Sequence, residues 1–290
     1  MGADGLNSTI RLQSAIHKIN ELSKNLTINL KFVFITGDIT NTALKSQYDQ
    51  VFSLLNTLSI DYYPIIGNHD QWSYNSTWET DKPTGDQLFA ETFKKILTKS
   101  NIINYPNSTV WNPKENCQSW FQNYRIQINN TIFICLDWNS RHPAVAQLGY
   151  KGSMPTAELH DFTGGTLPWL NDQLEQLSQQ QKSSSLLNIV LLQHHPLRAP
   201  WYIPGDIYAF SELKRLKIKS ILDKYKKNLH FFGLFAGHFH MWSNGTAYDD
   251  WKTFIQWETE ACKETKAFTL MTVNELDGSI INMEKYYGDL

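Results

Sequence analysis

The sequence predicts a single-domain α/β fold, in which helices and strands alternate along the chain. Two observations predict it. Segments with apolar residues at helical spacing alternate with short apolar runs, and a polar motif follows four of these runs. No linker rich in Pro, Gly or Ser divides residues 1–290, and this length suits one α/β domain. We therefore expect one domain whose functional groups follow the ends of strands.

Helices are predicted where apolar side chains recur every three or four residues, and strands where short runs are rich in β-branched and aromatic residues. The predicted helices span residues 9–22, 46–58, 87–97, 167–180 and 211–224. The predicted strands span residues 31–36, 62–66, 120–128, 131–137, 186–192, 231–236, 267–273 and 280–286. Asn129-Asn130, which joins two of these strands, predicts a type I′ hairpin turn.

Composition limits the partners of the chain. Hydrophobic residues make up 41% and aromatic residues 13%, which is ample for one core. No apolar stretch approaches the ~20 residues that a membrane span needs, so we expect no membrane span. The net charge of −2 gives no excess of positive charge for non-specific binding to nucleic acid. We expect a small-molecule substrate, no nucleic-acid partner and a monomer.

The cysteines and the glycosylation sequons indicate the cellular compartment in which the protein is expected. Cys135 lies within an apolar run, where a buried free thiol is the usual state, and Cys117 with Cys262 is a candidate disulfide. Six Asn-x-Ser/Thr sequons predict a glycoprotein of the secretory pathway, secreted or lysosomal. They begin at Asn7, Asn25, Asn75, Asn107, Asn129 and Asn244. The alternative is that an Asn-rich sequence contains them by chance.

The four polar motifs contain the residue types that bind divalent metal ions. In chain order they are Gly37-Asp38, Gly67-Asn68-His69-Asp70, His194-His195-Pro196 and Gly237-His238-Phe239-His240. Carboxylate and amide oxygens with neutral imidazoles accept iron, manganese and zinc alike. Extended backbone directs residues two apart, such as His238 and His240, to the same side, and a loop can aim each at a different ion. Each motif alone is weak evidence, but the ordered set predicts a two-metal site.

With these motifs the chain resembles the calcineurin-like metallophosphoesterases over roughly residues 8–286. The resemblance implies a four-layer αββα sandwich of two mixed β-sheets flanked by helices. It implies that Asp38 bridges two metal ions, that Asn68, His194 and His238 complete the coordination of one ion, and that His240 helps hold the other. His69 would be the catalytic histidine, and Asp70 could hold its imidazole by a hydrogen bond.

The implied activity is metal-dependent hydrolysis of a phosphate monoester or diester. Two divalent or mixed-valence ions (Mn, Fe or Zn) lower the pKa of a bridging water, and the resulting hydroxide attacks phosphorus in line. No covalent intermediate is needed. Arg141 and His142, in the loop after Asp137, are weaker candidates for contact with the phosphate, and ordinary surface roles are the favoured alternative.

The chain departs from the family pattern at its N-terminus. The family opens with a strand that ends in Asp-x-His, whose side chains are metal ligands, and residues before Thr9 offer no such motif. Residues 1–5 resemble the family's segment directly after that motif, so we expect an N-terminally truncated chain in which Met1 is internal and the first strand is missing. The alternative is a short isoform or degenerate homologue, which would be a non-catalytic or weakly active binding protein.

Overall fold

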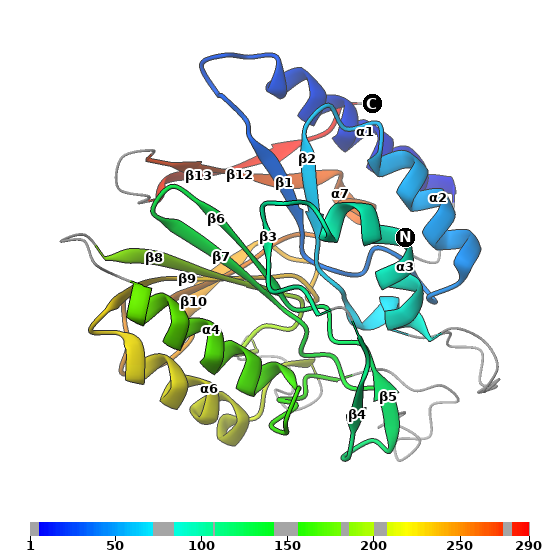
Figure 1. Cartoon of the computed structure of the whole chain (residues 1–290). Helices are drawn as coiled ribbons and strands as arrows, with labels where there is room; N and C mark the ends of the chain where they lie inside the picture. Colours follow the sequence, from blue (N-terminus) through cyan, green and yellow to red (C-terminus); the bar gives the residue numbers. More distant parts are fainter. Residues whose placement is uncertain are drawn as a thin grey trace.

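The computed structural model describes residues 6–71, 84–106, 108–141, 156–180, 186–199, 208–274 and 280–289, and it confirms the predicted α/β fold (Figure 1). The helices are α1 (Leu6–Ser23), α2 (Lys45–Leu55), the 3-10 helix η1 (Asn68–Asp70), α3 (Gly85–Leu97), α4 (Thr166–Gln180), α6 (Glu212–Tyr225) and α7 (Cys262–Thr265). The strands are β1 (Phe32–Ile35), β2 (Asp61–Pro64), β3 (Ile102–Ile103), β4 (Val110–Asn112), β5 (Cys117–Ser119), β6 (Tyr124–Ile128), β7 (Thr131–Leu136), β8 (Leu187–Gln193), β9 (Leu229–Ala236), β10 (Ser243–Thr246), β11 (Ile255–Glu258), β12 (Ala267–Val273) and β13 (Ile280–Tyr287).

A seven-stranded mixed sheet forms the centre of the fold, in the order β10-β11-β9-β8-β7-β6-β3. Strands β7, β8, β9 and β11 run parallel, whereas β10, β6 and β3 are antiparallel to their neighbours. Every residue of β7 is buried, as its continuous apolar sequence predicts for a strand covered on both faces. Because the four parallel strands end at one edge of the sheet, the loops that follow β8 and β9 lie close together.

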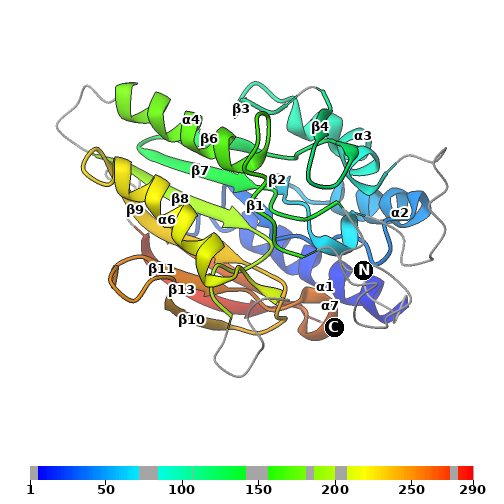
Figure 2. The same cartoon turned by 90° about the horizontal axis from the view of Figure 1, so that it is seen from below.

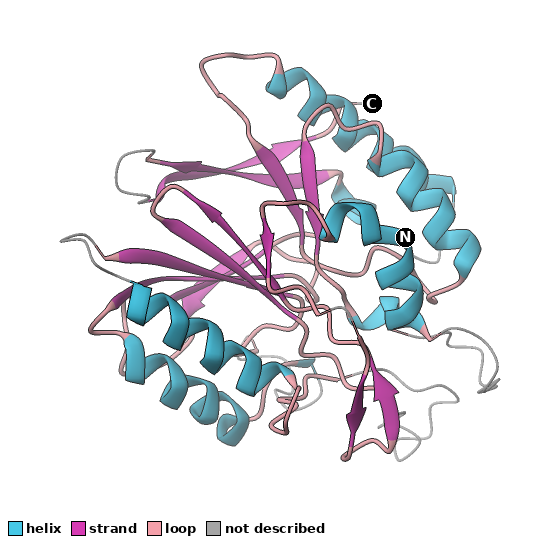
Figure 3. Ribbon diagram, viewed as in Figure 1, coloured by secondary structure: helices cyan, strands magenta, loops and turns pink. Residues whose placement is uncertain are grey.

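Helices and smaller sheets cover the two faces of the large sheet. Helices α4 and α6 lie side by side on one face (Figure 2). On the other face lie two separate pairs of strands, the parallel pair β1-β2 and the antiparallel pair β12-β13, with α1 and α2 outside them (Figure 3). The predicted αββα layering is therefore present, and its second sheet consists of two pairs of strands.

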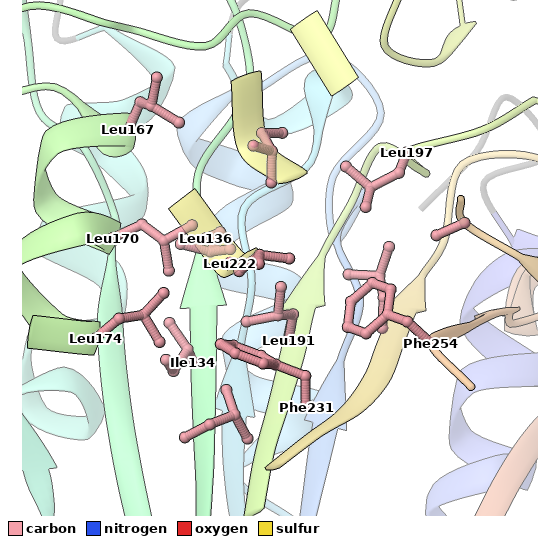
Figure 4. Packing of buried hydrophobic residues seen from close by; sticks show 14 of the residues in the cluster. Ile134, Leu136, Leu167, Leu170, Leu174, Leu191, Leu197, Leu222, Phe231 and Phe254 are labelled. Atoms are coloured by element: carbon pink, nitrogen blue, oxygen red, sulfur yellow. The ribbon is translucent and has the colours of Figure 1, made fainter. Parts of the chain in front are cut away.

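Two hydrophobic clusters form on opposite faces of the large sheet, and alternate residues of β7 belong to each. Ile134 and Leu136 pack against α4 and α6 in one cluster (Figure 4). Phe133 and Cys135 belong to the other cluster, together with side chains of β1, β2 and the outer helices. This alternation follows from the two-residue period of a strand.

All predicted helices and strands are present, but three details were wrong. The strand predicted from residue 120 begins at Tyr124, because the backbone N–H of Trp120 and of Gln122 donate to side-chain carboxylates (2.8 and 3.0 Å) instead of to a neighbouring strand. The predicted type I′ turn needs positive φ at both central residues, whereas of Asn129 and Asn130 only Asn129 has it (51°). The candidate disulfide is absent, since all three cysteines are free.

None of the described helices is long and apolar enough to cross a membrane.

Candidate metal centre

Four of the predicted metal ligands come together from the ends of four strands. Asp38 lies in the loop after β1, Asn68 begins η1 after β2, His194 follows β8 and His238 follows β9. β1 pairs in parallel with β2, and β8 pairs in parallel with β9, so each pair delivers its ligands to the same end. The loop geometry also requires glycine. A Cβ at Gly37 (φ 95°) would lie 2.4 Å from His194 Nδ1.

His194 Nε2 is the centre of the cluster. It lies 3.2 Å from Asp38 Oδ1, 2.9 Å from Asn68 Oδ1 and 3.1 Å from His238 Nδ1. His238 Nδ1 lies 3.1 Å from the same Asn68 oxygen. The ligand atoms of Asp38, His194 and His238 all lie within 4.8 Å of one another.

The hydrogen-bond pattern of His194 shows that this cluster suits a cation. His194 Nδ1 lies 2.8 Å from the carbonyl oxygen of Thr36, which can only accept, so Nδ1 carries the proton. In the neutral imidazole Nε2 then presents a lone pair, and it faces two oxygens and one further nitrogen. Lone pairs that converge in this way repel one another unless a positive charge lies among them. Oxygen and imidazole nitrogen donors are those that divalent Mn, Fe and Zn accept.

The charges of the cluster are those of a metal ligand set. Burial opposes ionisation of Asp38, but His194 and its neighbouring histidines hold the pKa of the carboxyl well below its usual value. Burial, with the nearby His194, lowers the pKa of His238 to about 3. For His194, the charge and hydrogen bond of Asp38 outweigh burial and raise the pKa. A metal ion at Nε2 therefore competes with a proton, so metal affinity should rise with pH.

His69 lies beside Asp38, with its imidazole held by a backbone carbonyl. The N–H of His69 donates to Asp38 Oδ1 (3.0 Å), and its Nε2 lies 3.9 Å from Asp38 Oδ2. On the other side of the ring, Nδ1 lies 2.8 Å from the carbonyl oxygen of Asn41. Sequence reasoning missed Asn41 as the residue that orients this imidazole, because a backbone carbonyl leaves no signal in the sequence.

Asp70 joins the two loops that carry the ligands. Its buried carboxylate accepts hydrogen bonds from the backbone N–H of Ile39 (3.1 Å), Thr40 (2.6 Å) and Gly67 (2.9 Å), and from the hydroxyl of Thr40 (2.9 Å). The loop after β1 and the loop after β2 are therefore held together by one side chain. The predicted role of Asp70 in orienting His69 stays a prediction.

The other two histidines of the motifs lie differently from the four central ligands. His240 Nδ1 lies 2.7 Å from Glu264 Oε1, and within the described ranges His240 is not part of the compact group around His194. Its role as a ligand of a second ion stays a prediction. His195 is buried, and its ring packs 4.5 Å from that of His238.

Comparison with known proteins gives the family. Residues 6–242 match the sequence model of the calcineurin-like phosphoesterases. The chain belongs to this family. No curated protein sequence matches it.

Two solved structures resemble the fold of this calcineurin-like phosphoesterase. A dimetal phosphatase from Danio rerio is 14% identical, with a TM-score of 0.53, and the match covers 89% of this chain and 79% of that one. A putative 5'-nucleotidase from Staphylococcus aureus, solved in complex with alpha-ketoglutarate, is also 14% identical with a TM-score of 0.53. That match covers 95% of this chain and 48% of the other, so the chain spans about half its length.

The phosphoesterase also contains a buried charge cluster that sequence reasoning did not find. Arg141 forms ion pairs with Asp137 (2.6 Å) and Asp86 (3.1 Å), and it is only 5% exposed. Its guanidinium is neutralised and enclosed, so a contact with substrate phosphate is not supported. Asn139, in the same loop, donates to the carbonyl oxygen of Ile66 (3.0 Å), which precedes the glycine of the second motif. His142 lies outside the described residues.

Proposed function

We propose that this chain hydrolyses phosphate monoesters or diesters at a site that holds two metal ions. The observation that carries the proposal is the convergence of Asp38, Asn68, His194 and His238 on one point, next to His69. Bound ions would supply a water of lowered pKa and would neutralise the charge of the phosphate. The family supports metal-dependent phosphoester hydrolysis in general.

We assign Asp38 to metal binding and His69 to protonation of the leaving oxygen. Asp38 is held as the anion, with Oδ1 3.2 Å from His194 Nε2. His69 carries a proton on Nδ1 toward Asn41, so its Nε2 can donate to a leaving oxygen only as the imidazolium. The Oδ2 atom of Asp38 lies 3.9 Å from this Nε2.

The second ion is the least supported part of the proposal. We propose Asp38 and His240 as its ligands, which requires the imidazole of His240 to leave Glu264. Measuring metal content per chain after dialysis tests this point. We expect two ions per chain, and one after His240→Ala. One ion in both proteins would contradict the dinuclear assignment.

The activity is tested with p-nitrophenyl phosphate and bis(p-nitrophenyl) phosphate, with Mn²⁺, Fe²⁺ or Zn²⁺ added. We expect His69→Ala to lower kcat by about 100-fold or more, because general-acid groups contribute on that scale, while metal content stays unchanged. His17→Ala, at an exposed position of α1, is the matched control and should leave both unchanged. Full activity of His69→Ala would exclude the role given to His69.

A metal-binding homologue without catalysis is the second candidate function. It is favoured by the single compact cluster among the described residues and by the contact of His240 with Glu264. The same assays separate the two. A chain that binds one ion and phosphate but hydrolyses neither ester at any of the three metals would be a binding protein.

We also propose that the protein passes through the secretory pathway. The sequon asparagines Asn7, Asn25 and Asn129 are exposed, as N-glycosylation requires. Asn244 is exposed as well, but a glycan there would crowd the proposed site near His240, so we expect this sequon to be unused. Asn75 and Asn107 lie outside the described residues. Expression in a secretory host followed by glycosidase treatment tests this, and a chain whose mass does not change on treatment would contradict it.

A further inference from the structure

The candidate metal cluster is assembled from two sheets. Asp38 and Asn68 follow β1 and β2, whereas His194 and His238 follow strands of the large sheet. The distances between the two pairs of ligands therefore depend on how the sheets are held together at this edge. Asn139 lies in the loop after β7 of the large sheet, and its side chain reaches the loop after β2. It is 1% exposed, so this contact is made away from solvent.

Asn68 depends on its backbone for the position of its side chain. The residue is fully buried, and its Oδ1 lies 2.9 Å from His194 Nε2 and 3.1 Å from His238 Nδ1. Among the described residues, no hydrogen-bond partner meets its Nδ2. No described group outside the cluster therefore fixes the amide by a hydrogen bond. A shift or rotation of the backbone at Asn68 moves the ligand oxygen directly.

Two buried side chains hold the peptide unit between Ile66 and Gly67, one residue before the ligand Asn68. The carbonyl oxygen of Ile66 accepts from Asn139 Nδ2 (3.0 Å). The N–H of Gly67 donates to Asp70 Oδ2 (2.9 Å). Because a peptide unit is planar, the two hydrogen bonds together fix the rotation of this plane. The direction in which the chain approaches Asn68 is thereby set, and Asn139 supplies one of the two contacts that set it.

The amide of Asn139 is itself held by the buried charge cluster. Its Nδ2 and its backbone N–H both donate to Asp137 Oδ1 (3.1 and 3.2 Å). A reversed amide would place its oxygen against this carboxylate and against the carbonyl oxygen of Ile66, so the contacts determine which way the amide points. Burial opposes ionisation of Asp137, but the neighbouring Arg141 outweighs it and lowers the pKa, so the acceptor is charged. Arg141 therefore acts on Asn139 through Asp137.

We propose that Asn139 is a positioning residue for the metal ligand Asn68. Asp137 and Arg141 fix its amide for this role. The hydrogen bond to Ile66 ties the loop after β2 to the large sheet, and so sets how far the two halves of the cluster lie from each other. A residue that only stabilised the fold would leave the affinity of the folded chain for metal unchanged. The proposal deepens the proposed function, because it rests on an ion bound at Asn68, and it assigns no chemical step to Asn139.

The first test removes the donor and measures metal binding. Asn139→Ala and Asn139→Leu, of which the second keeps the branched shape of the side chain, both lose the hydrogen bond to Ile66. Calorimetric titration with Zn²⁺ should show an affinity about 10- to 100-fold lower in each, the range expected when a residue that orients a metal ligand is removed. The matched control is Asn188→Ala, at a buried asparagine near the start of β8 that pairs with His230. It should lower stability and leave Zn²⁺ affinity within about twofold.

Hydrogen exchange in the metal-free chain measures the effect on the loop itself. We expect the Gly67 amide to exchange about tenfold faster or more in Asn139→Ala and to be unchanged in Asn188→Ala, because only the first change frees the peptide unit. If Zn²⁺ affinity stays unchanged in both Asn139 variants, or falls only as far as in the control, the proposal is overturned and the proposed function stands. If the unsubstituted chain binds no Zn²⁺, the metal centre is contradicted, and the proposed function and this proposal are both overturned.

Discussion

Asp70→Asn tests whether one buried carboxylate holds the metal-binding loops together. The least costly orientation of the new amide places its nitrogen next to Thr40, whose hydroxyl can rotate to accept from it. The N–H of Thr40, which donates to Asp70 across 2.6 Å, then loses its acceptor. The hydrogen bonds from Ile39 and Gly67 survive, but with a neutral acceptor.

The expected loss of stability follows from these contacts. A buried donor without a partner costs about 1–3 kcal/mol, and replacing a charged acceptor by a neutral one weakens each remaining bond by about 1 kcal/mol. Part of this is offset, because burial and the nearby Asp38 raise the pKa of Asp70 and thus disfavour its charge. We expect the free energy of unfolding to fall by roughly 3 kcal/mol.

Urea unfolding at neutral pH measures this loss, and calorimetric titration with Zn²⁺ measures the effect on the site. Metal affinity should fall as well, because Asn68 lies in η1 between Gly67 and Asp70. Asp49→Asn, an exposed position paired with Lys45, is the control and should change stability by less than about 0.5 kcal/mol. An Asp70→Asn protein with the stability and Zn²⁺ affinity of the unchanged chain would refute this account of the loops.

Three further predictions concern the metal ligands, a buried acid and the core. His194→Ala should weaken Zn²⁺ binding by more than about 100-fold in the same titration, because it removes the atom at the centre of the cluster; a smaller loss would exclude it as a ligand. Burial raises the pKa of Glu258 to about 7, so the folded chain binds this proton more tightly than the unfolded chain and stability falls as pH rises through the range between the ordinary value of 4.5 and 7. Glu258→Gln should therefore be more stabilising at pH 8 than at pH 5 in urea unfolding, and equal effects at both would contradict the assignment. Leu174→Ala, at a fully buried position of α4, should cost about 2–5 kcal/mol of unfolding free energy, and a loss below 1 kcal/mol would mean that the site collapses around the smaller side chain.

The sequence predicted the parts of the fold that depend on local pattern. The long apolar runs of β7, β8 and β9 are unmistakable, and the motifs that follow β8 and β9 converge because parallel strands end at one edge. The short strands β10 and β11 were missed. β10 reads Ser-Asn-Gly-Thr and has no alternation, so its pairing with β11 comes from tertiary contacts that a local pattern does not contain.

The sequence predicted which residues come together at the candidate metal centre. It did not predict the contacts that surround them. Asp38, Asn68, His194 and His238 each follow a strand, and parallel pairing brings Asp38 to Asn68 and His194 to His238. The approach of the two pairs to each other depends on packing between separate sheets, which the sequence does not show. Arg141 forms an ion pair with Asp86, which is far away in the sequence. No periodic pattern connects two residues at such a separation. The pairing of His240 with Glu264 likewise depends on α7, a helix of four residues that carries no sequence signal.

The backbone conformation near the candidate metal centre lowers the stability of the folded chain. His238 (φ 77°) and His240 (φ 58°) adopt the left-handed conformation, which costs a residue other than glycine about 1–2 kcal/mol. Glycine at either position would relieve that cost and would remove an imidazole. A library of variants screened only for survival of heating should therefore become enriched in glycine at these two positions, whereas a screen that includes a divalent ion should retain His238, which belongs to the cluster around His194.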